Sequence, residues 1–269
     1  MLLLVDLDGV VYRGAQPVPG VADVLKERAK AGDRVIYVTN NSRAHRDEYR
    51  ARLAALGLPL SPDGIVTAAR ATALLLAELE PSPNVAMVLG GPGLARELRE
   101  VGLRVVPPTE KGLAAQPGAL VVGVDFSLTY RRLSIAAEAV RRGARFVATN
   151  RDPIYPTAEG LAAGAGAMVA AVAVAAGREP DLVVGKPEPR LFEAAAELCG
   201  VPADEAVVIG DGLLTDIRAA RAVGARSILM LTGVTTADDL ARAPTEQQPT
   251  AVARDAAELR QRLEEFASR

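Results

Sequence analysis

The sequence predicts an α/β fold in which a parallel sheet is connected by crossover helices. Short apolar runs alternate with segments of helical periodicity along the chain, which is typical of such folds. The 269 residues exceed the roughly 150 residues of an ordinary domain and suggest two domains. Apolar residues make up 49% and charged residues 24% of the chain, close to globular averages, so it can bury a core.

The expected strands and helices follow one another in three sets. The first set is LLLVDLD, a helix near 20–31, RVIYVTN, a helix near 43–56, IVTA and a helix near 68–79. The segment PSPN at 81–84 then marks a linker, because its prolines interrupt a helix. The second set is VAMVLGG, a helix near 93–101, LRVV, ALVVGVD, a helix near 130–142, RFVATN and an Ala-rich helix near 164–176. The third set is DLVVGKP, a helix near 189–199, AVVIGD, a helix near 216–223, SILMLTG and a helix near 252–266.

Composition excludes several classes of function. Basic and acidic residues nearly cancel, 31 against 33, and aromatic residues are only 3% with no Trp, which argues against nucleic-acid binding. A single Cys and a single His leave almost no room for disulfides, Cys/His zinc sites or a Ser-His-Asp triad. We expect Cys199 to be a small buried hydrophobe and His45 to lie at a solvated helix start.

Nothing in the sequence indicates a membrane protein. The chain opens on Met-Leu-Leu-Leu-Val and meets Asp6 at once, unlike a secretory signal, so we expect a cytoplasmic protein. Residues 160–177 are uncharged, but they are mostly Ala and Gly and would gain little from lipid. We expect a closely packed helix there instead of a membrane span.

Polar residues interrupt the apolar strands where those strands end. The four ends are Asp6-Leu7-Asp8-Gly9, Thr39-Asn40-Asn41, Gly185-Lys186-Pro187 and Gly210-Asp211. Ligands bind beyond the carboxyl ends of strands in open α/β sheets. With a side-chain period of two, Asp6 and Asp8 point the same way. Such a pair needs a cation, a shared proton or a functional reason.

The carboxylates favour magnesium. Asp211 ends its strand as Asp6 does, and Asp216 follows five residues later, where a simple helix cap is the alternative interpretation. Carboxylates without His or Cys are hard oxygen ligands that suit Mg²⁺ better than zinc. Magnesium in such sites usually completes its shell with water and a phosphate. The pattern therefore indicates phosphoryl chemistry.

The other strand ends supply groups that suit a phosphate. Thr39 and Asn40 offer a hydroxyl, an amide and backbone N–H donors before a helix. Lys186, one of only four lysines, would offset the charge of phosphate and aspartates. The segments AGDRVIYVTNN (31–41) and RGARFVATNRD (142–152) both close a strand with Thr-Asn, so both could face a ligand. The segment GGPGLA at 90–95 lacks the Lys-Ser/Thr of a Walker loop.

In this order, DLDGVVYRG (6–14), VTNNS (38–42), GKPEP (185–189) and GDGLLTDI (210–217) resemble the four motifs of the haloacid dehalogenase superfamily of phosphatases. Residues 148–172 and LTGVTT at 231–236 resemble its nitrophenylphosphatase-like branch. The resemblance implies a Rossmann-like three-layer core formed by residues 1–80 and 181–269. It also implies a smaller α/β cap domain inserted at 81–180.

The resemblance implies roles for the aspartates. Asp6 would be the nucleophile that forms an aspartyl-phosphate. Asp8 would protonate the leaving oxygen and then deprotonate the attacking water. Mg²⁺ would be held by Asp6, the Asp8 backbone carbonyl and Asp211, with Asp216 orienting ligands from behind.

The resemblance also assigns the remaining positions. Thr39 and Asn40 would hold phosphate oxygens, and Lys186 would neutralise charge at the nucleophile. Residues assigned to the wall of the substrate pocket are Asn150, Asp152 and, more weakly, Tyr155. The apolar stretch Gly212-Leu213-Leu214 departs from the polar residues often found there, and this could alter the entrance.

The expected activity is magnesium-dependent hydrolysis of a small phosphate monoester, and the substrate stays open. A non-catalytic sensor of a phosphorylated metabolite is the alternative from another class. A dehalogenase would lack Asp8. A phosphomutase would carry a helical cap for which the about 30 residues between Asp8 and Thr39 leave no space. Relatives often dimerise through the cap, so we expect a homodimer, with the Ala-rich helix at the interface.

Overall fold

The computed structural model describes residues 1–157 and 160–268. Its contacts divide the chain into two compact units. The first unit comprises Met1–Thr39, Asp47–Val66 and the segment from Lys186 onward, and the second comprises Asn40–Arg46 and Thr67–Gly185. Each unit contains its own sheet with parallel strand pairs, so the predicted α/β fold is confirmed. The expected domain boundaries at 80–81 and 180–181 stay a prediction.

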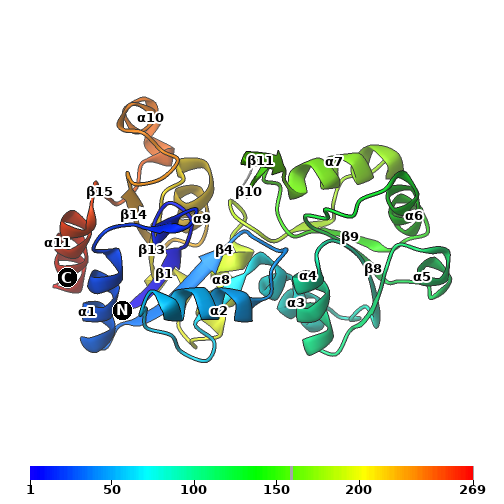
Figure 1. The fold of residues 1–269 in the computed structure, drawn as a ribbon, viewed down its shortest axis with the longest axis horizontal. Helices are drawn as coiled ribbons and strands as arrows, with labels where there is room; N and C mark the ends of the chain where they lie inside the picture. The colour runs from blue at the N-terminus through cyan, green and yellow to red at the C-terminus, as the bar shows by residue number, and fades with distance from the viewer. Residues whose placement is uncertain (158–159, 269) are drawn as a thin grey trace. The chain divides into compact units, whose positions relative to one another are not determined.

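The first unit is built on a six-stranded sheet in the order β15-β14-β13-β1-β4-β5 (Figure 1). Its strands are β1 (Leu2–Asp6), β4 (Arg34–Thr39), β5 (Ile65–Thr67), β13 (Val207–Gly210), β14 (Arg226–Met230) and β15 (Ala251–Ala253). β1 pairs in parallel with both β4 and β13. All five residues of β1 are buried, as expected for a central parallel strand covered on both faces.

Helices and short turns surround this sheet. The helices are α1 (Val21–Lys30), α2 (Arg46–Ala55), α8 (Arg190–Glu197), α9 (Arg218–Ala222), α10 (Ala237–Arg242) and α11 (Ala256–Ala267). A two-stranded hairpin, β2 (Tyr12–Arg13) and β3 (Gln16–Pro17), follows β1. Single helical turns lie at Ala203–Glu205, Leu213–Ile217 and Thr245–Gln247. α1 packs against α11, and α8 packs on β1 and β4.

The second unit contains a five-stranded sheet in the order β12-β9-β8-β6-β7, and its pairs are parallel. The strands are β6 (Val85–Leu89), β7 (Arg104–Val106), β8 (Ala119–Val122), β9 (Arg145–Ala148) and β12 (Leu182–Val183). The helices are α3 (Ala68–Glu78), α4 (Pro92–Glu100), α5 (Glu110–Ala114), α6 (Tyr130–Arg141) and α7 (Ala165–Ala176). An antiparallel hairpin, β10 (Ile154–Thr157) and β11 (Gly160–Ala163), precedes α7.

The Ala-rich segment forms a short helix with one buried face. α7 has 12 residues, and among residues 1–157 and 160–268 no helix has the length and apolarity that a membrane span requires. Val169, Val172 and Ala173 are buried in the core of the second unit, whereas Val174 is 86% exposed. Residues 160–163, at the start of the uncharged stretch, belong to β11 instead.

Several elements differ from the sequence expectation. The last helix begins at Ala256, not near 252, because Ala251–Ala253 pair with β14 as strand β15. Asp255 then caps α11 by accepting from the N–H groups of Ala257 and Glu258. The expected helix near 216–223 is split into a wide turn at Leu213–Ile217 and the short α9. The two hairpins, α5 and α10 had no counterpart in the sequence analysis.

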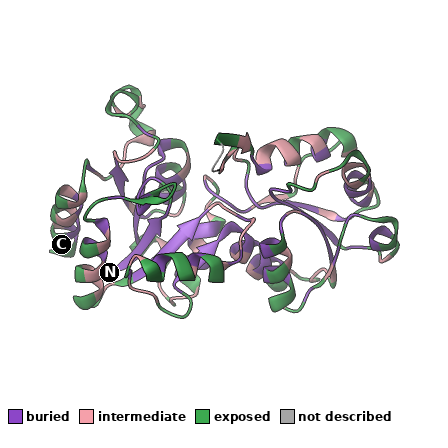
Figure 2. Ribbon diagram, viewed as in Figure 1, coloured by how far each residue is buried: buried purple, intermediate pink, exposed green. Residues whose placement is uncertain are grey.

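Most residues in the strands of both sheets are buried (Figure 2). In the second unit, Phe146 on β9 is completely buried and packs with Leu120 and Val122 of β8 and with residues of α6 and α7. Because such a core is close-packed, a large side chain there cannot be removed without leaving a cavity.

We expect Phe146→Ala to lower the free energy of unfolding of the second unit by about 3–5 kcal/mol, the usual cost of truncating a buried aromatic ring. Val174→Ala on the exposed face of α7 serves as the control and should change it by less than about 0.5 kcal/mol. Urea unfolding followed by circular dichroism measures both. Equal effects of the two substitutions would contradict the assigned core.

Candidate active site

The carboxyl ends of β1 and β13 bring the predicted aspartates together. Asp6 is the last residue of β1, and Asp211 directly follows β13. The two strands are parallel neighbours, with Val5 opposite Ile209. Asp216 comes from the wide turn after β13, and all three aspartates are buried. One carboxylate oxygen from each lies within 4.8 Å of the other two.

Lys186 lies between two of these carboxylates. Its Nζ donates to Asp6 Oδ1 and to Asp216 Oδ1, each at 2.6 Å. The lysine is as buried as its partners. One ammonium therefore faces a cluster that carries three negative charges when fully ionised. Buried charges are stable only when they are paired, so this contact holds the cluster together.

The site shifts the pKa values of its own acids. Burial raises the pKa of Asp6 well above its ordinary value, and the charges of Asp216 and Asp211 add to this, whereas Lys186 acts in the opposite direction. Burial and the Asp216 charge raise the pKa of Asp211 to about 6. Burial alone would lower the pKa of Lys186, but Asp216 and Asp6 more than offset this and raise it. The cluster therefore has excess negative charge that a cation would relieve.

The donor chemistry fits a hard divalent cation. Asp6 and Asp211 each present carboxylate oxygens, the ligands that Mg²⁺ prefers. Asp216 is engaged by the protein on both oxygens, because Lys186 donates to Oδ1 while the Gly212 N–H and the Thr215 hydroxyl donate to Oδ2 at 3.1 Å. That arrangement suits the supporting role expected for Asp216 better than direct ligation.

Two glycines make space for Asp211. A Cβ on Gly9 would lie 2.1 Å from Asp211 Oδ2, and one on Gly233 would lie 1.8 Å from it. Gly9 also has a φ of +82°, a conformation that side chains disfavour. The next residue, Val234, donates its N–H to Asp211 Oδ2 at 2.7 Å. The loop after β14 therefore fixes the orientation of this carboxylate.

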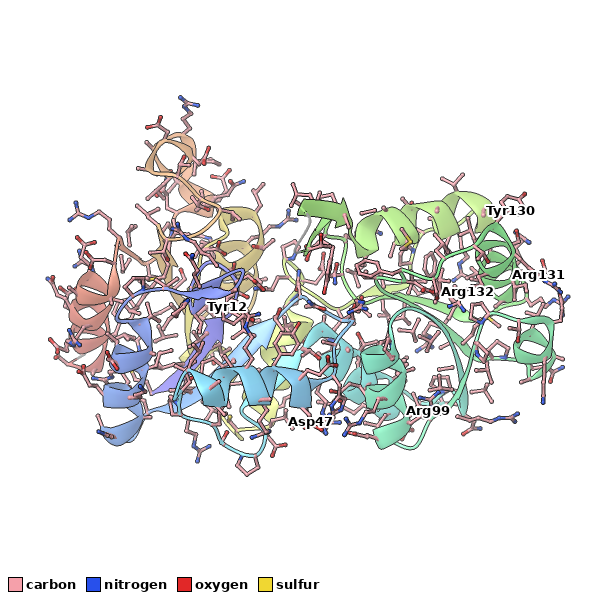
Figure 3. The ribbon with its side chains drawn as sticks, viewed as in Figure 1. Tyr12, Asp47, Arg99, Tyr130, Arg131 and Arg132 are labelled. Atoms are coloured by element: carbon pink, nitrogen blue, oxygen red, sulfur yellow. The ribbon has the colours of Figure 1, made fainter. Side chains whose placement is uncertain are left out.

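Asp8 lies at the base of the β2–β3 hairpin. It forms a bridge with Tyr12, and the Gly9 N–H donates to the Tyr12 carbonyl at 2.8 Å. Tyr12, labelled in Figure 3, is buried beneath the guanidinium of Arg52, whose Cζ lies 3.4 Å from the ring centre. Desolvation raises the pKa of Asp8, and the Arg52 and Lys186 charges offset part of this.

Thr39 is the last residue of β4, which is a neighbour of β1. The residue before it, Val38, pairs with Asp6. The Thr39 side chain is buried. Six predicted residues belong to the first unit, which are Asp6, Asp8, Thr39, Lys186, Asp211 and Asp216. Contacts join four of them, Asp6, Lys186, Asp211 and Asp216.

The second unit contains the other four predicted residues, Asn40, Asn150, Asp152 and Tyr155. The Nδ2 of Asn40 donates to both carboxylate oxygens of Asp152, at 3.1 and 3.0 Å. The Nδ2 of Asn150 donates to the Asn40 backbone carbonyl at 2.7 Å. Tyr155 OH accepts from the Nδ2 of Asn41 at 3.0 Å. Asn40, Asn150 and Asp152 therefore bind one another within the second unit, and Tyr155 binds the residue next to Asn40.

His45 directly precedes α2, so the expected helix start is correct, but its side chain is not solvated. It is buried, and its Nε2 lies 3.3 Å from Glu97 Oε1 and 3.2 Å from Glu100 Oε1. Arg46 forms ion pairs with both glutamates, and Arg70 lies 3.8 Å from Glu97. Because guanidinium groups already pair with these carboxylates, we interpret the cluster as structural and not as a second metal site.

The apolar stretch Leu213-Leu214 lines a cavity of about 440 Å³ in the first unit. Val234, Thr235, Arg242 and Pro244 also line it. Leu214 and Val234 are largely exposed. The departure from polar residues therefore makes an apolar cavity wall beside the Asp211 loop.

Sequence reasoning missed the groups that orient the aspartates. It assigned no role to Gly233 and Val234, although LTGVTT was noted, or to Arg52. A glycine two residues after the apolar run SILML is a usable signal for close backbone approach. Arg52 has no such signal, because its ring contact joins α2 to a hairpin about 40 residues earlier.

Comparison with known proteins identifies the family of this chain. A family model described as haloacid dehalogenase-like hydrolase matches residues 3–104, and a second, described as HAD-hydrolase-like, matches residues 183–259. A D-glycerol 3-phosphate phosphatase of Mycobacterium tuberculosis is 40% identical over 260 residues, which cover 96% of this chain and 70% of the relative.

Solved structures of phosphatases superpose closely on this chain. A p-nitrophenyl phosphatase from Archaeoglobus fulgidus superposes with a TM-score of 0.88 at 32% identity, covering 97% of this chain and 98% of that one. A glycerol phosphate phosphatase from Mycobacterium tuberculosis in complex with magnesium superposes with a TM-score of 0.85 at 38% identity, covering 96% and 75%. The chain therefore belongs to the haloacid dehalogenase-like hydrolase family, among its phosphatases.

Proposed function

We propose that this chain is a magnesium-dependent phosphomonoester hydrolase that acts on a small phosphorylated metabolite through an aspartyl-phosphate on Asp6. The observation that carries the proposal is the buried group of Asp6, Asp211 and Asp216 with Lys186 donating to two of its members. The magnesium complex of a related phosphatase supports the choice of metal.

Asp6 is the nucleophile of the proposed reaction. One carboxylate oxygen attacks phosphorus, the ester oxygen leaves, and water later hydrolyses the aspartyl-phosphate, which divides one difficult displacement into two. When bound by Asp6, Asp211 and the Asp8 carbonyl, Mg²⁺ would polarise a phosphoryl oxygen as a Lewis acid and favour the ionised carboxylates. Lys186, held at Asp6 Oδ1, offsets the charge that accumulates at the nucleophile.

Asp8 transfers the protons. Its raised pKa favours the protonated form that the first step needs, in which the carboxyl group donates to the leaving alkoxide. The resulting carboxylate then takes a proton from the attacking water. Thr39 and Asn40 donate to the non-bridging phosphate oxygens.

Cytoplasmic location, and a homodimer formed through the cap, remain predictions from the sequence.

We expect Asp6→Asn to reduce turnover of phosphate esters by at least about 10³-fold, because an amide cannot act as the nucleophile. Hydrolysis of p-nitrophenyl phosphate and of a panel of phosphorylated metabolites with Mg²⁺ measures it, and circular dichroism checks the fold. Asp204→Asn, the same substitution at an exposed site of the first unit, is the control. A wild-type protein that binds these esters without hydrolysing any would favour the sensor instead.

For Asp8→Asn we expect a loss that depends on the leaving group. An alkyl phosphate needs its oxygen protonated as it leaves, whereas p-nitrophenolate leaves readily without a proton. The rate constant for formation of the aspartyl-phosphate should therefore fall at least about tenfold more with glycerol phosphate than with p-nitrophenyl phosphate. Rapid-quench kinetics isolates that step. Equal losses for both esters would refute the acid role of Asp8.

Metal binding should weaken in acid. Protonation of Asp211, whose pKa in the metal-free protein is about 6, competes with the cation. Above pH 7 the carboxyl is mostly ionised, and at pH 5, one unit below this pKa, about nine tenths of it is protonated. The apparent affinity for Mg²⁺ should thus fall at least about tenfold between pH 7.5 and 5. Calorimetric titration with MgCl₂ measures this, and a pH-independent affinity would contradict it.

A further inference from the structure

The segment Asn40–Arg46 is bound to the rest of the second unit through most of its residues. Besides the contacts of Asn40, the Asn41 amide donates to Tyr155, and the Thr149 hydroxyl donates to Ser42 Oγ at 2.9 Å. The Gly93 N–H donates to the Arg43 carbonyl at 3.0 Å. The backbone of Asn40–Arg46 is therefore fixed by residues far away in sequence.

Asp152 selects one of the two orientations of the Asn40 amide. An asparagine amide can be turned so that its oxygen and its nitrogen exchange places. An ionised carboxylate accepts hydrogen bonds but cannot donate one. Because both oxygens of Asp152 lie within 3.1 Å of the amide, the Nδ2 must face Asp152.

The opposite side of the amide is closed as well. A Cβ on Gly185 would lie 2.7 Å from Asn40 Oδ1 and 2.7 Å from the Asn150 Cβ. Gly185 thus lets Asn40 and Asn150 pack directly against the backbone before Lys186. Asp152 therefore lies against the nitrogen of the Asn40 amide, and the Gly185 backbone lies against its oxygen.

Asn150 links the backbone of Asn40 to the backbone of Asp152. Its Nδ2 donates to the Asn40 carbonyl at 2.7 Å, and its Oδ1 accepts from the Asp152 N–H at 3.0 Å. Asn150 is 3% exposed. Both ends of its amide are used to fix the backbones of Asn40 and Asp152.

We propose that Asp152 is a positioning residue that, together with Asn150, orients the Asn40 amide for phosphate binding and does not itself contact the substrate. The proposal rests on the proposed function, in which Asn40 donates to the phosphate. A carboxylate placed directly against a phosphate would repel it. Asp152 instead accepts from Nδ2, and because an amide nitrogen carries two hydrogens, the same nitrogen can donate to Asp152 and to a phosphate at once.

A double-mutant cycle between positions 152 and 40 tests this. In the wild-type background, Asp152→Ala should lower kcat/KM for a phosphate ester and raise the inhibition constant of inorganic phosphate, each by roughly tenfold. In the Asn40→Ala background, Asp152→Ala should change neither quantity by more than about twofold, since the residue through which it acts is gone. Asp152→Asn keeps the size of the side chain and can donate as well as accept, so its loss should be intermediate.

The control is Asp181→Ala. Asp181 accepts the Phe146 N–H at 2.6 Å in the same unit, so its removal perturbs the unit without touching Asn40. Its effect should be the same in both backgrounds. If the effect of Asp152→Ala is as large with Asn40→Ala as without it, or absent in the wild type, the positioning role is overturned. Circular dichroism verifies that each variant is folded, and Asp152→Asn replaces Asp152→Ala if the latter is not.

The two proposals can fail separately. A wild-type protein that hydrolyses no ester contradicts the proposed function. The double-mutant cycle between positions 152 and 40 is then measured by calorimetry, as the affinity of each variant for inorganic phosphate. Coupled losses of phosphate affinity would still support positioning by Asp152. Independent losses, or no binding of phosphate by the wild type, would overturn it.

Discussion

The buried ammonium of Lys186 between Asp6 and Asp216 is the interaction on which the candidate site depends. Moving a charged group out of water costs several kcal/mol per ion even after the protein relaxes. Three carboxylates within 4.8 Å of one another add mutual repulsion to this cost. A single ammonium offsets only part of it, so the raised pKa values of Asp6 and Asp211 and the proposed affinity for a divalent cation have the same origin.

The parallel sheet makes this concentration of charge possible. Strands that run in the same direction end at the same edge, so residues about 200 positions apart become neighbours when β1 pairs with β13. Lys186 reaches the same edge from a third segment. The loop after β14 then fixes Asp211 with a backbone N–H, and two glycines leave space for its carboxylate.

Much of this could be predicted from the sequence, because the signals are local. Asp6 and Asp211 interrupt apolar runs, and Lys186 is one of only four lysines in a chain whose basic residues are mostly arginine. The environment of His45 could not be predicted, since the glutamates that bury it lie about 50 residues later on α4. For the same reason, a helix was expected where β15 forms: the pairing partner that makes Ala251–Ala253 a strand is elsewhere in the chain. The two Thr-Asn strand ends were expected to face a ligand, yet Asn150 and Asn40 also bind each other.

The peptide bond between Gly185 and Lys186 joins two sets of contacts that belong to different units. On one side, Gly185 packs against Asn40 and Asn150, and on the other, Lys186 bonds to Asp6 and Asp216. Insertions and deletions are usually absorbed where a loop can lengthen without disturbing its ends. Both residues that flank this bond are held by contacts within their own units, so neither belongs to a loop that could absorb an added residue. Natural length variation in this family should therefore avoid this junction.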